Sequence, residues 1–420
     1  MNVSRVDKFI NDILRHPTLK ESSDLRADPV ALVLSDIEPT KRATMAHVAV
    51  TLALRCYSGP IRIYGEAGGA TGLPTAPTLG TYLGTLAHIY GAPERLEWRD
   101  GTPCESTALF IGRGPPTAFI ADAAGWVAGT NIELPAAAEA EVPACMFAVS
   151  CVFAQLFGSS LLGTPGRHAW SFSLLDYCLS PSAPTAHQRQ CFDCGEISIL
   201  GAGALGSAFA YGLWLSTWTA HALVIDSDRY DEPNRETTCL IGLEHIRRCS
   251  PKATALAEAM RRPGLEAAGL AERVGAGSAV LKDPRRYFIC GVDNPATRRE
   301  LDLHQSTWLL NAGVGGTSRD AGMVLVSRHG PADPPLSGLY RTSSPEGQGG
   351  STLDHLPSEA QDACSRIPYQ QVSLAAPFVA TAAASLLLAS AAGHTAKMPS
   401  YLKLDLLGLQ DKIDLRRISR

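Results

Sequence analysis

The sequence predicts an α/β protein with doubly wound, mostly parallel sheets in two tandem halves. Two observations predict this class. Apolar, β-rich runs alternate with helix-like stretches along most of the 420 residues, which is typical of parallel sheets with helices between their strands. Hydrophobic residues make up 45% of the chain and charged residues 19%, so it can bury the cores that such sheets require.

The second half shows the alternation most clearly, from about Cys191 onward. The expected strands are 197–200, 222–225, 288–292 and 307–311. We expect a helix after the first strand, through about Trp218, and further helices at 251–262 and 295–305. This pattern predicts a Rossmann-like unit.

The first half shows a looser form of the same rhythm. Its expected strands are 30–34, 61–64, 108–111 and 118–121, and its expected helices are 40–57, 78–90 and 143–158. The helices that close the halves, 144–156 and 375–388, are both rich in small residues. Asp36 and Glu38, rather than glycines, follow the first strand, which disfavours a bound phosphate there.

These observations divide the chain into two parts. We expect a degenerate half at 1–185 and a working half at 190–420, joined by a Ser/Pro/Gln-rich linker near 180–190. Residues 372–393 carry no charge and are long enough to span a bilayer. Because Ala and Ser dominate there and Pro377 lies inside, we expect a buried core helix instead.

The amino-acid composition limits the possible binding partners and the cellular compartment. The net charge of −4 gives no electrostatic basis for binding nucleic acid or an anionic membrane. The 11 cysteines lie mostly in apolar runs, which favours free thiols over disulfides. Without an apolar segment of secretory type near the N-terminus, we expect a cytoplasmic protein.

Residues 197–206 show the strand–turn–helix pattern of a nucleotide-binding unit, with glycines at Gly201, Gly203 and Gly206. The first glycine permits a tight turn, the second lets the backbone approach a phosphate, and the third lets the helix pack on the strand. The helix N-terminus adds unpaired N–H groups and a partial positive charge. NAD, FAD and ATP proteins share this pattern.

Three further features narrow the range of possible ligands. Asp226 and Asp228 end the next expected strand, where a carboxylate can accept both ribose hydroxyls. Lys252 opens a helix and can reach a phosphate chain as a point charge. Asp293 follows a strand at the sheet edge where ligands bind, and it can hold a metal that bridges phosphates.

Together these motifs resemble the ThiF/MoeB and ubiquitin-activating adenylyltransferases. That family shows the glycine motif, an Asp-x-Asp with an Asn eight residues after the first Asp, a helix-opening Lys, and an Asp-Asn followed closely by Arg. Over residues 195–395 the chain supplies these elements in order: Gly201, Gly203, Gly206, Asp226, Asp228, Asn234, Lys252, Asp293, Asn294 and Arg298.

The resemblance implies that ATP and Mg²⁺ are the cofactors. The reaction it implies is attack by the C-terminal carboxylate of a ubiquitin-like protein on the α-phosphate, with pyrophosphate leaving. It assigns the ribose to Asp226, the phosphates to Lys252, Mg²⁺ to Asp293 and the lining of the nucleotide site to Asn234. Positioning and charge neutralisation then accelerate the displacement.

The chain departs from the family at two places. The family carries an Arg three residues after the Asn, where this chain has Thr237, and Arg235 is the candidate to take over the role. The sulfur-carrier branch has paired Cys-x-x-Cys motifs for zinc, whereas here Cys191 and Cys194 form a single pair. One pair cannot complete a four-ligand zinc site, so we expect ordinary thiols.

Cys364 is the candidate nucleophile. Its surroundings, residues 361–366, resemble the crossover segment of autophagy-type activating enzymes, where a Cys takes the activated protein as a thioester. The expected crossover loop, about 327–371, is rich in Gly, Pro and Ser, as mobile exposed loops are. A core cysteine at a helix entrance is the alternative.

The resemblance also implies partners. The first half would act as an internal pseudo-dimer partner, with Arg5 or Arg15 reaching the triphosphate. A homodimer of whole chains and a conjugating enzyme are further options. A bacterial ubiquitin-like conjugation pathway is the implied setting, and antiviral defence is one known use of such pathways. The alternatives are a sulfur-carrier or peptide-modifying adenylyltransferase without a thioester, an NAD-dependent oxidoreductase, and a scaffold made inactive by the change at Thr237.

Overall fold

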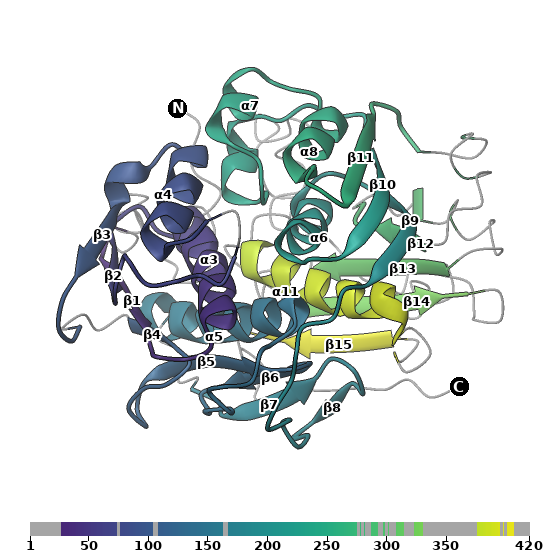
Figure 1. Ribbon diagram of the computed structural model, residues 1–420. Helices are drawn as coiled ribbons and strands as arrows, with labels where there is room; N and C mark the ends of the chain where they lie inside the picture. Colours follow the sequence, from purple (N-terminus) through teal and green to yellow (C-terminus); the bar gives the residue numbers. More distant parts are fainter. Residues whose placement is uncertain are drawn as a thin grey trace, which may run out of the picture.

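The structure of the chain is a computed structural model. The structure describes residues 27–73, 76–103, 108–162, 167–274, 278, 281, 287–292, 297–298, 301, 308–314, 323–330, 376–394, 398 and 401–406. Two sheets lie in it, with helices packed between them (Figure 1).

The first sheet has the strand order β3-β2-β1-β4-β5-β6-β7-β8. Its strands are β1 (Val30–Leu34), β2 (Ile61–Tyr64), β3 (Leu96–Arg99), β4 (Ala108–Ile111), β5 (Phe119–Ala124), β6 (Val127–Thr130), β7 (Trp170–Ser173) and β8 (Cys178–Leu179). Its helices are α3 (Pro39–Cys56), α4 (Leu79–Ile89), the 3₁₀ turn η1 (Pro93–Arg95) and α5 (Val142–Leu162). The expected strands 30–34, 61–64 and 108–111 are confirmed with the same bounds.

The second sheet has the order β11-β10-β9-β12-β13-β14-β15. Its strands are β9 (Asp193–Leu200), β10 (Thr219–Ile225), β11 (Leu265–Leu270), β12 (Tyr287–Cys290), β13 (Trp308–Val314), β14 (Met323–His329) and β15 (Tyr401–Asp405). Its helical elements are α6 (Ala204–Leu215), η2 (Glu232–Glu236), α7 (Leu243–Arg247), α8 (Lys252–Met260), α11 (Ala376–Ala389) and the short π-helical segment η7 (Ser390–His394). Of the expected helix 295–305, residues 297, 298 and 301 are described, and they are helical.

The two sheets share one topology. Strands β1–β7 correspond in order to β9–β15, and both sets are parallel up to the fifth strand and antiparallel beyond it. The helices match too, because α3 and α6 follow the first strands and α5 and α11 precede the seventh. The predicted α/β class with mostly parallel, doubly wound sheets is confirmed.

Most other boundaries differ from the sequence expectation by a few residues, and three of these differences lie between residues 288 and 330. Residues 327–329 belong to β14, so the crossover loop expected at 327–371 cannot begin before 330, and its remainder lies outside the described residues. Strand β12 ends at Cys290 instead of 292: its pairing with β9 ends at Cys290 opposite Leu200, and residues 291 and 292 have no regular structure. Strand β13 continues to Val314, since antiparallel pairing with β14 supports it there.

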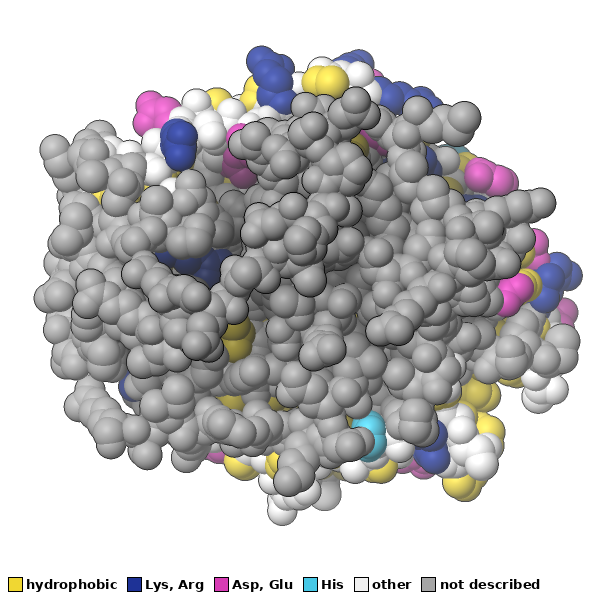
Figure 2. All heavy atoms as spheres, turned by 180° about the vertical axis from the view of Figure 1, so that it is seen from behind, with side chains coloured by type: hydrophobic (Ala, Val, Ile, Leu, Met, Phe, Trp, Pro, Cys, Tyr) yellow, Lys and Arg dark blue, Asp and Glu magenta, His cyan; other side chains and the backbone are white. Residues whose placement is uncertain are grey.

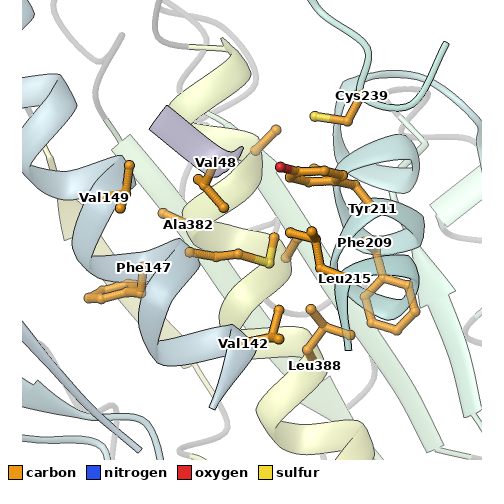
Figure 3. Close-up of a cluster of buried hydrophobic side chains, with 14 of the residues drawn as sticks. Val48, Val142, Phe147, Val149, Phe209, Tyr211, Leu215, Cys239, Ala382 and Leu388 are labelled. Atoms are coloured by element: carbon orange, nitrogen blue, oxygen red, sulfur yellow. The ribbon is translucent and has the colours of Figure 1, made fainter. Parts of the chain in front are cut away.

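Helices α5 and α11 pack against each other in the centre of the molecule (Figure 1). Figure 3 shows their apolar side chains, with Val142 and Phe147 on α5 and Leu388 on α11, beside α6. Phe378, Ala382 and Leu388 have no exposed surface, so the expected core helix is confirmed. None of the described helices combines the length and the apolar character that a bilayer crossing requires.

The two halves share one hydrophobic core. It runs from β1 and α3 through α5 and α11 to α6 and β9 without interruption. Polar contacts also cross it: the Tyr211 hydroxyl on α6 lies 2.7 Å from His47 Nδ1 and 3.1 Å from Thr51 Oγ1, both on α3. The Tyr177 hydroxyl lies 2.9 Å from Ser390 Oγ. The halves are therefore docked by both apolar and polar groups.

The segment expected as a linker lacks regular structure and is fastened to the first half. Arg189 donates from Nε to the Ala140 carbonyl at 2.7 Å and from Nη2 to Thr44 Oγ1 at 2.8 Å. The Gln190 N–H donates to Glu141 Oε1 at 2.9 Å. On the face shown in Figure 2, the visible Lys and Arg side chains of the described residues lie at several separate places.

Candidate nucleotide site

The candidate site lies where the strand order of the second sheet reverses. From β9 the chain continues to β10 on one side, and β12 pairs with β9 on the other side. The Gly201 N–H donates to the Ile225 carbonyl and the Gly291 N–H to the Leu200 carbonyl, both at 2.9 Å. The ends of these three strands therefore meet at the edge where open α/β sheets bind ligands.

The glycine turn joins β9 to α6, and its geometry demands glycine at two positions. Gly201 has a φ of +89°, and a Cβ there would lie 3.3 Å from the Gly291 carbonyl carbon. A Cβ at Gly206 would collide with the Gly201 carbonyl oxygen, so α6 can pack this closely on the turn only without a side chain. Among the residues that the structure describes, a Cβ at Gly203 would meet no atom within 4 Å, so there is open space beside this glycine.

The first turn of α6 has no side-chain cap, because its N-cap residue is Gly203. The corresponding helix of the first half differs. There Glu38 Oε1 accepts from the Thr40 N–H at 2.8 Å and Oε2 from the Lys41 N–H at 2.6 Å. The chain's own carboxylate therefore occupies the place at α3 where an anion would bind, as the acidic residues there predicted.

Asp226 stands at the end of β10 and faces the glycine turn. Its Oδ2 accepts from the Ala202 N–H at 2.7 Å, and its Oδ1 accepts from the Asp228 N–H at 2.8 Å. Because each carboxylate oxygen has two lone pairs, both oxygens can accept one more donor. Asp226 thus stabilises the glycine turn, and its two carboxylate oxygens can still accept hydrogen bonds from hydroxyl groups.

Lys252 opens α8 beside these carboxylates. Its Nζ lies 3.3 Å from Asp228 Oδ2, and its backbone N–H donates to the Asp228 carbonyl at 2.8 Å. The Lys252 side chain is 13% exposed, whereas the Asp228 side chain is 68% exposed. The structure therefore brings Lys252, Asp226 and Asp228 together at one end of the sheet.

Asn234 and Arg235 lie on η2. Asn234 is buried, and its side-chain oxygen accepts from the Asp231 N–H at 3.0 Å in a reciprocal capping box. The Arg235 side chain is 46% exposed and lies 3.6 Å from Glu232. Thr237 is buried, and its Oγ1 donates to the Asn234 carbonyl at 3.4 Å. In this structure all three stabilise the short helix itself.

Arg298 is buried and connects two strands. Its Nε donates to the Val292 carbonyl at 2.7 Å and its Nη2 to the Ala312 carbonyl at 3.2 Å, so it holds the ends of β12 and β13 together. The predicted metal ligand Asp293, its neighbour Asn294, the predicted nucleophile Cys364, and Arg5 and Arg15 lie outside the described residues.

Two residues of the site escaped the sequence analysis. The Tyr230 hydroxyl donates to the Ala202 carbonyl at 2.9 Å, and burial raises its pKa well above the usual range, so it remains a donor. Ser207, in the first turn of α6, accepts from the Cys239 N–H at 2.9 Å. Both residues hold the chain around the glycine turn. Tyr230 lies two residues beyond Asp228, and this closeness is the signal that could have found it.

Cys191 and Cys194 lie in different surroundings. Cys191 is exposed and its thiol donates to the Thr217 carbonyl at 3.2 Å, whereas Cys194 is buried. Within the described ranges, no three His, Cys, Asp or Glu side chains are grouped closely enough to hold a metal ion.

Residues 195–397 match the family model of the BilD C-terminal domain. Solved structures of E. coli MccB are similar in part. The structure of MccB alone has a TM-score of 0.40 at 14% identity, over 53% of this chain and 61% of that one. The structure with AMPCPP and selenomethionine MccA has a TM-score of 0.39 at 12% identity, over 53% and 62%. The chain thus spans less than two thirds of MccB. A comparison with functionally curated proteins gives no significant match.

Proposed function

We propose that the second half adenylates the C-terminal carboxylate of a ubiquitin-like protein with ATP. The observation that carries the proposal is the meeting of the glycine turn, Asp226 and Lys252 at the switch point of the second sheet. The BilD C-terminal domain match covers this same half, at 195–397.

Each described residue takes a role that its geometry supports. The uncapped start of α6 and the open space at Gly203 receive the phosphates. Asp226 accepts the ribose hydroxyls with its remaining lone pairs, and Lys252 exchanges Asp228 for a phosphate oxygen. The family resemblance adds Asn234 and Arg235 to the lining, and both lie on η2, where their side chains contact Asp231 and Glu232.

Asp293 would hold Mg²⁺. Asp293 follows β12 and Val292 in the sequence, and carboxylate oxygens are the ligands that Mg²⁺ prefers. When bound there, Mg²⁺ would supply charge neutralisation on the phosphates. The chain's own residues orient the carboxylate and the α-phosphate for in-line attack.

The first half would be a silent partner in an internal pseudo-dimer. It shares the topology of the second half, yet Glu38 already occupies the start of α3. A nucleotide phosphate there would face a carboxylate instead of free N–H groups. One ATP per chain follows from this difference.

A thioester step on Cys364 would follow adenylation. The thiolate sulfur attacks the carbonyl carbon of the acyl-adenylate, the new C–S bond forms, the C–O bond to the phosphate breaks, and AMP leaves. Without this step the chain would be a sulfur-carrier or peptide-modifying adenylyltransferase.

ATP–pyrophosphate exchange with the cognate ubiquitin-like protein tests the proposal. We expect exchange in the wild type and in Asp100→Ala, an exposed carboxylate of the first half, and a loss of about 100-fold or more in Asp226→Ala. Cys364→Ala should keep the exchange and lose the thioester, detected as a reducible adduct. No exchange in the wild type would overturn the adenylation. Product transfer undiminished in Cys364→Ala would overturn the thioester step alone.

A further inference from the structure

Residues 230–252 carry Asn234, Arg235 and Lys252 and are held from several sides. The Cys239 N–H donates to Ser207 Oγ in the first turn of α6, at 2.9 Å. Leu240 has a φ of +64°, a left-handed conformation that a leucine adopts only when its surroundings hold it there. The segment that presents the nucleotide-site residues is therefore fixed under strain beside the glycine turn.

The first half supplies the contact at this strained point. The Tyr90 hydroxyl, at the end of α4, accepts from the Leu240 N–H at 3.1 Å. Next to it, a Cβ at Gly242 would lie 2.9 Å from the Ile89 carbonyl oxygen, so the two backbones approach closely. The end of α4 thus lies directly against residues 240–242.

Arg55 orients Tyr90 from within the first half. Its Nη2 donates to the Tyr90 hydroxyl at 2.7 Å, and its guanidinium carbon lies 4.6 Å from the centre of the Tyr90 ring. Both side chains are buried, and Nε and Nη1 of Arg55 have no hydrogen-bond partner in the part of the chain that the structure describes.

We propose that Tyr90 is a positioning residue, oriented by Arg55, through which the first half fixes residues 230–252 and thereby the nucleotide site of the second half. The inference rests on the proposed function for its ATP readout, but not for its structural readout. This inference gives the silent half a definite role. The Tyr90 hydroxyl of that half accepts from the N–H of Leu240, the strained residue that precedes α7 and α8.

Tyr90→Phe removes the hydroxyl and keeps the ring. Tyr177→Phe is the matched control, because Tyr177 is also buried in the first half and its hydroxyl also reaches the second half, at Ser390 on η7. Two measurements on the full chain separate the variants: hydrogen exchange of the amides of residues 237–243, and the dissociation constant for ATP.

We expect Tyr90→Phe to speed amide exchange at 237–243 and to weaken ATP binding, each about tenfold, as the loss of a buried hydrogen-bond acceptor does. Tyr177→Phe should leave both unchanged even if its Tm falls by a similar amount. Equal changes in the two variants, or unchanged exchange in Tyr90→Phe, would overturn the positioning role. A wild type that binds no ATP would refute the proposed function, and the exchange measurement alone would then decide the role of Tyr90.

Discussion

Gly206→Ala tests the packing of the glycine turn. A Cβ at this position would lie 1.8 Å from the Gly201 carbonyl oxygen, whereas real Cβ atoms keep at least 3.0 Å from such an atom. Helix α6 must therefore retreat by the difference, 1.2 Å. Overpacking of this kind costs about 1–3 kcal/mol, and each kcal/mol lowers the Tm of a 420-residue chain with one shared core by roughly 1 °C. Because the start of α6 moves with the helix, we also expect ATP to bind at least about tenfold more weakly, or ~1.4 kcal/mol.

Two glycine variants serve as controls for this prediction. Within the described part of the chain, a Cβ at Gly203 or at Gly84 would meet no atom within 4 Å, so neither alanine is overpacked. Gly203→Ala should keep its Tm and still lose ATP affinity, because its methyl group fills the space expected for a phosphate. Gly84→Ala, inside α4, should raise stability by about 0.5–1 kcal/mol and leave ATP binding alone. Thermal unfolding and calorimetric ATP titration measure both quantities. A Gly206→Ala chain with wild-type Tm and wild-type affinity would refute the reasoning.

Three further predictions concern charged and titratable groups. Lys252→Ala should weaken ATP binding about tenfold in the same titration. It should change the free energy of unfolding by less than about 1 kcal/mol, because its partner Asp228 is mostly exposed. A large loss of stability would contradict this. Glu38→Ala should lower the free energy of unfolding in urea by about 1 kcal/mol, because α3 loses its N-terminal cap, and should leave the ATP affinity unchanged. Weaker ATP binding in this variant would contradict a silent first half. Burial lowers the pKa of His47 from 6.5 to about 3. Between these two pH values the imidazole is protonated in the unfolded chain but not in the folded one. The free energy of unfolding therefore falls as the pH decreases from 6.5, by up to about 1.4 kcal/mol per pH unit. His47→Gln should flatten that dependence in urea unfolding between pH 4.5 and 7, and an equal slope in both proteins would show that other groups cause it.

The parallel parts of both sheets were predictable because their strands are short apolar runs between clear helix and turn signals. Strand β1, VALVL, is one example. The strands that escaped prediction lie at edges or in antiparallel pairs. Strand β6, VAGT, contains Ala and Gly, and strand β11, LEAAGL, contains Ala, Gly and Glu, all residues of low β propensity. Pairing with neighbouring strands, rather than local preference, makes them strands.

The candidate site also has residues that the sequence predicts and residues that it does not. The sequence predicts that Gly201, Asp226 and Lys252 converge, because the ends of parallel strands meet at one edge and Lys252 opens the helix beside them. It carries no sign of Tyr90, which reaches Leu240 across 150 residues of sequence. Such a contact depends on how α4 docks against the second half, and no local pattern encodes that.

The stoichiometry of ATP binding tests the central claim most directly. Isothermal titration of the full chain should give one ATP per chain, with binding abolished by Asp226→Ala in the second half and retained in Glu38→Ala in the first. Two ATP per chain, or binding that survives Asp226→Ala, would contradict an account in which one half binds nucleotide and the other only supports it.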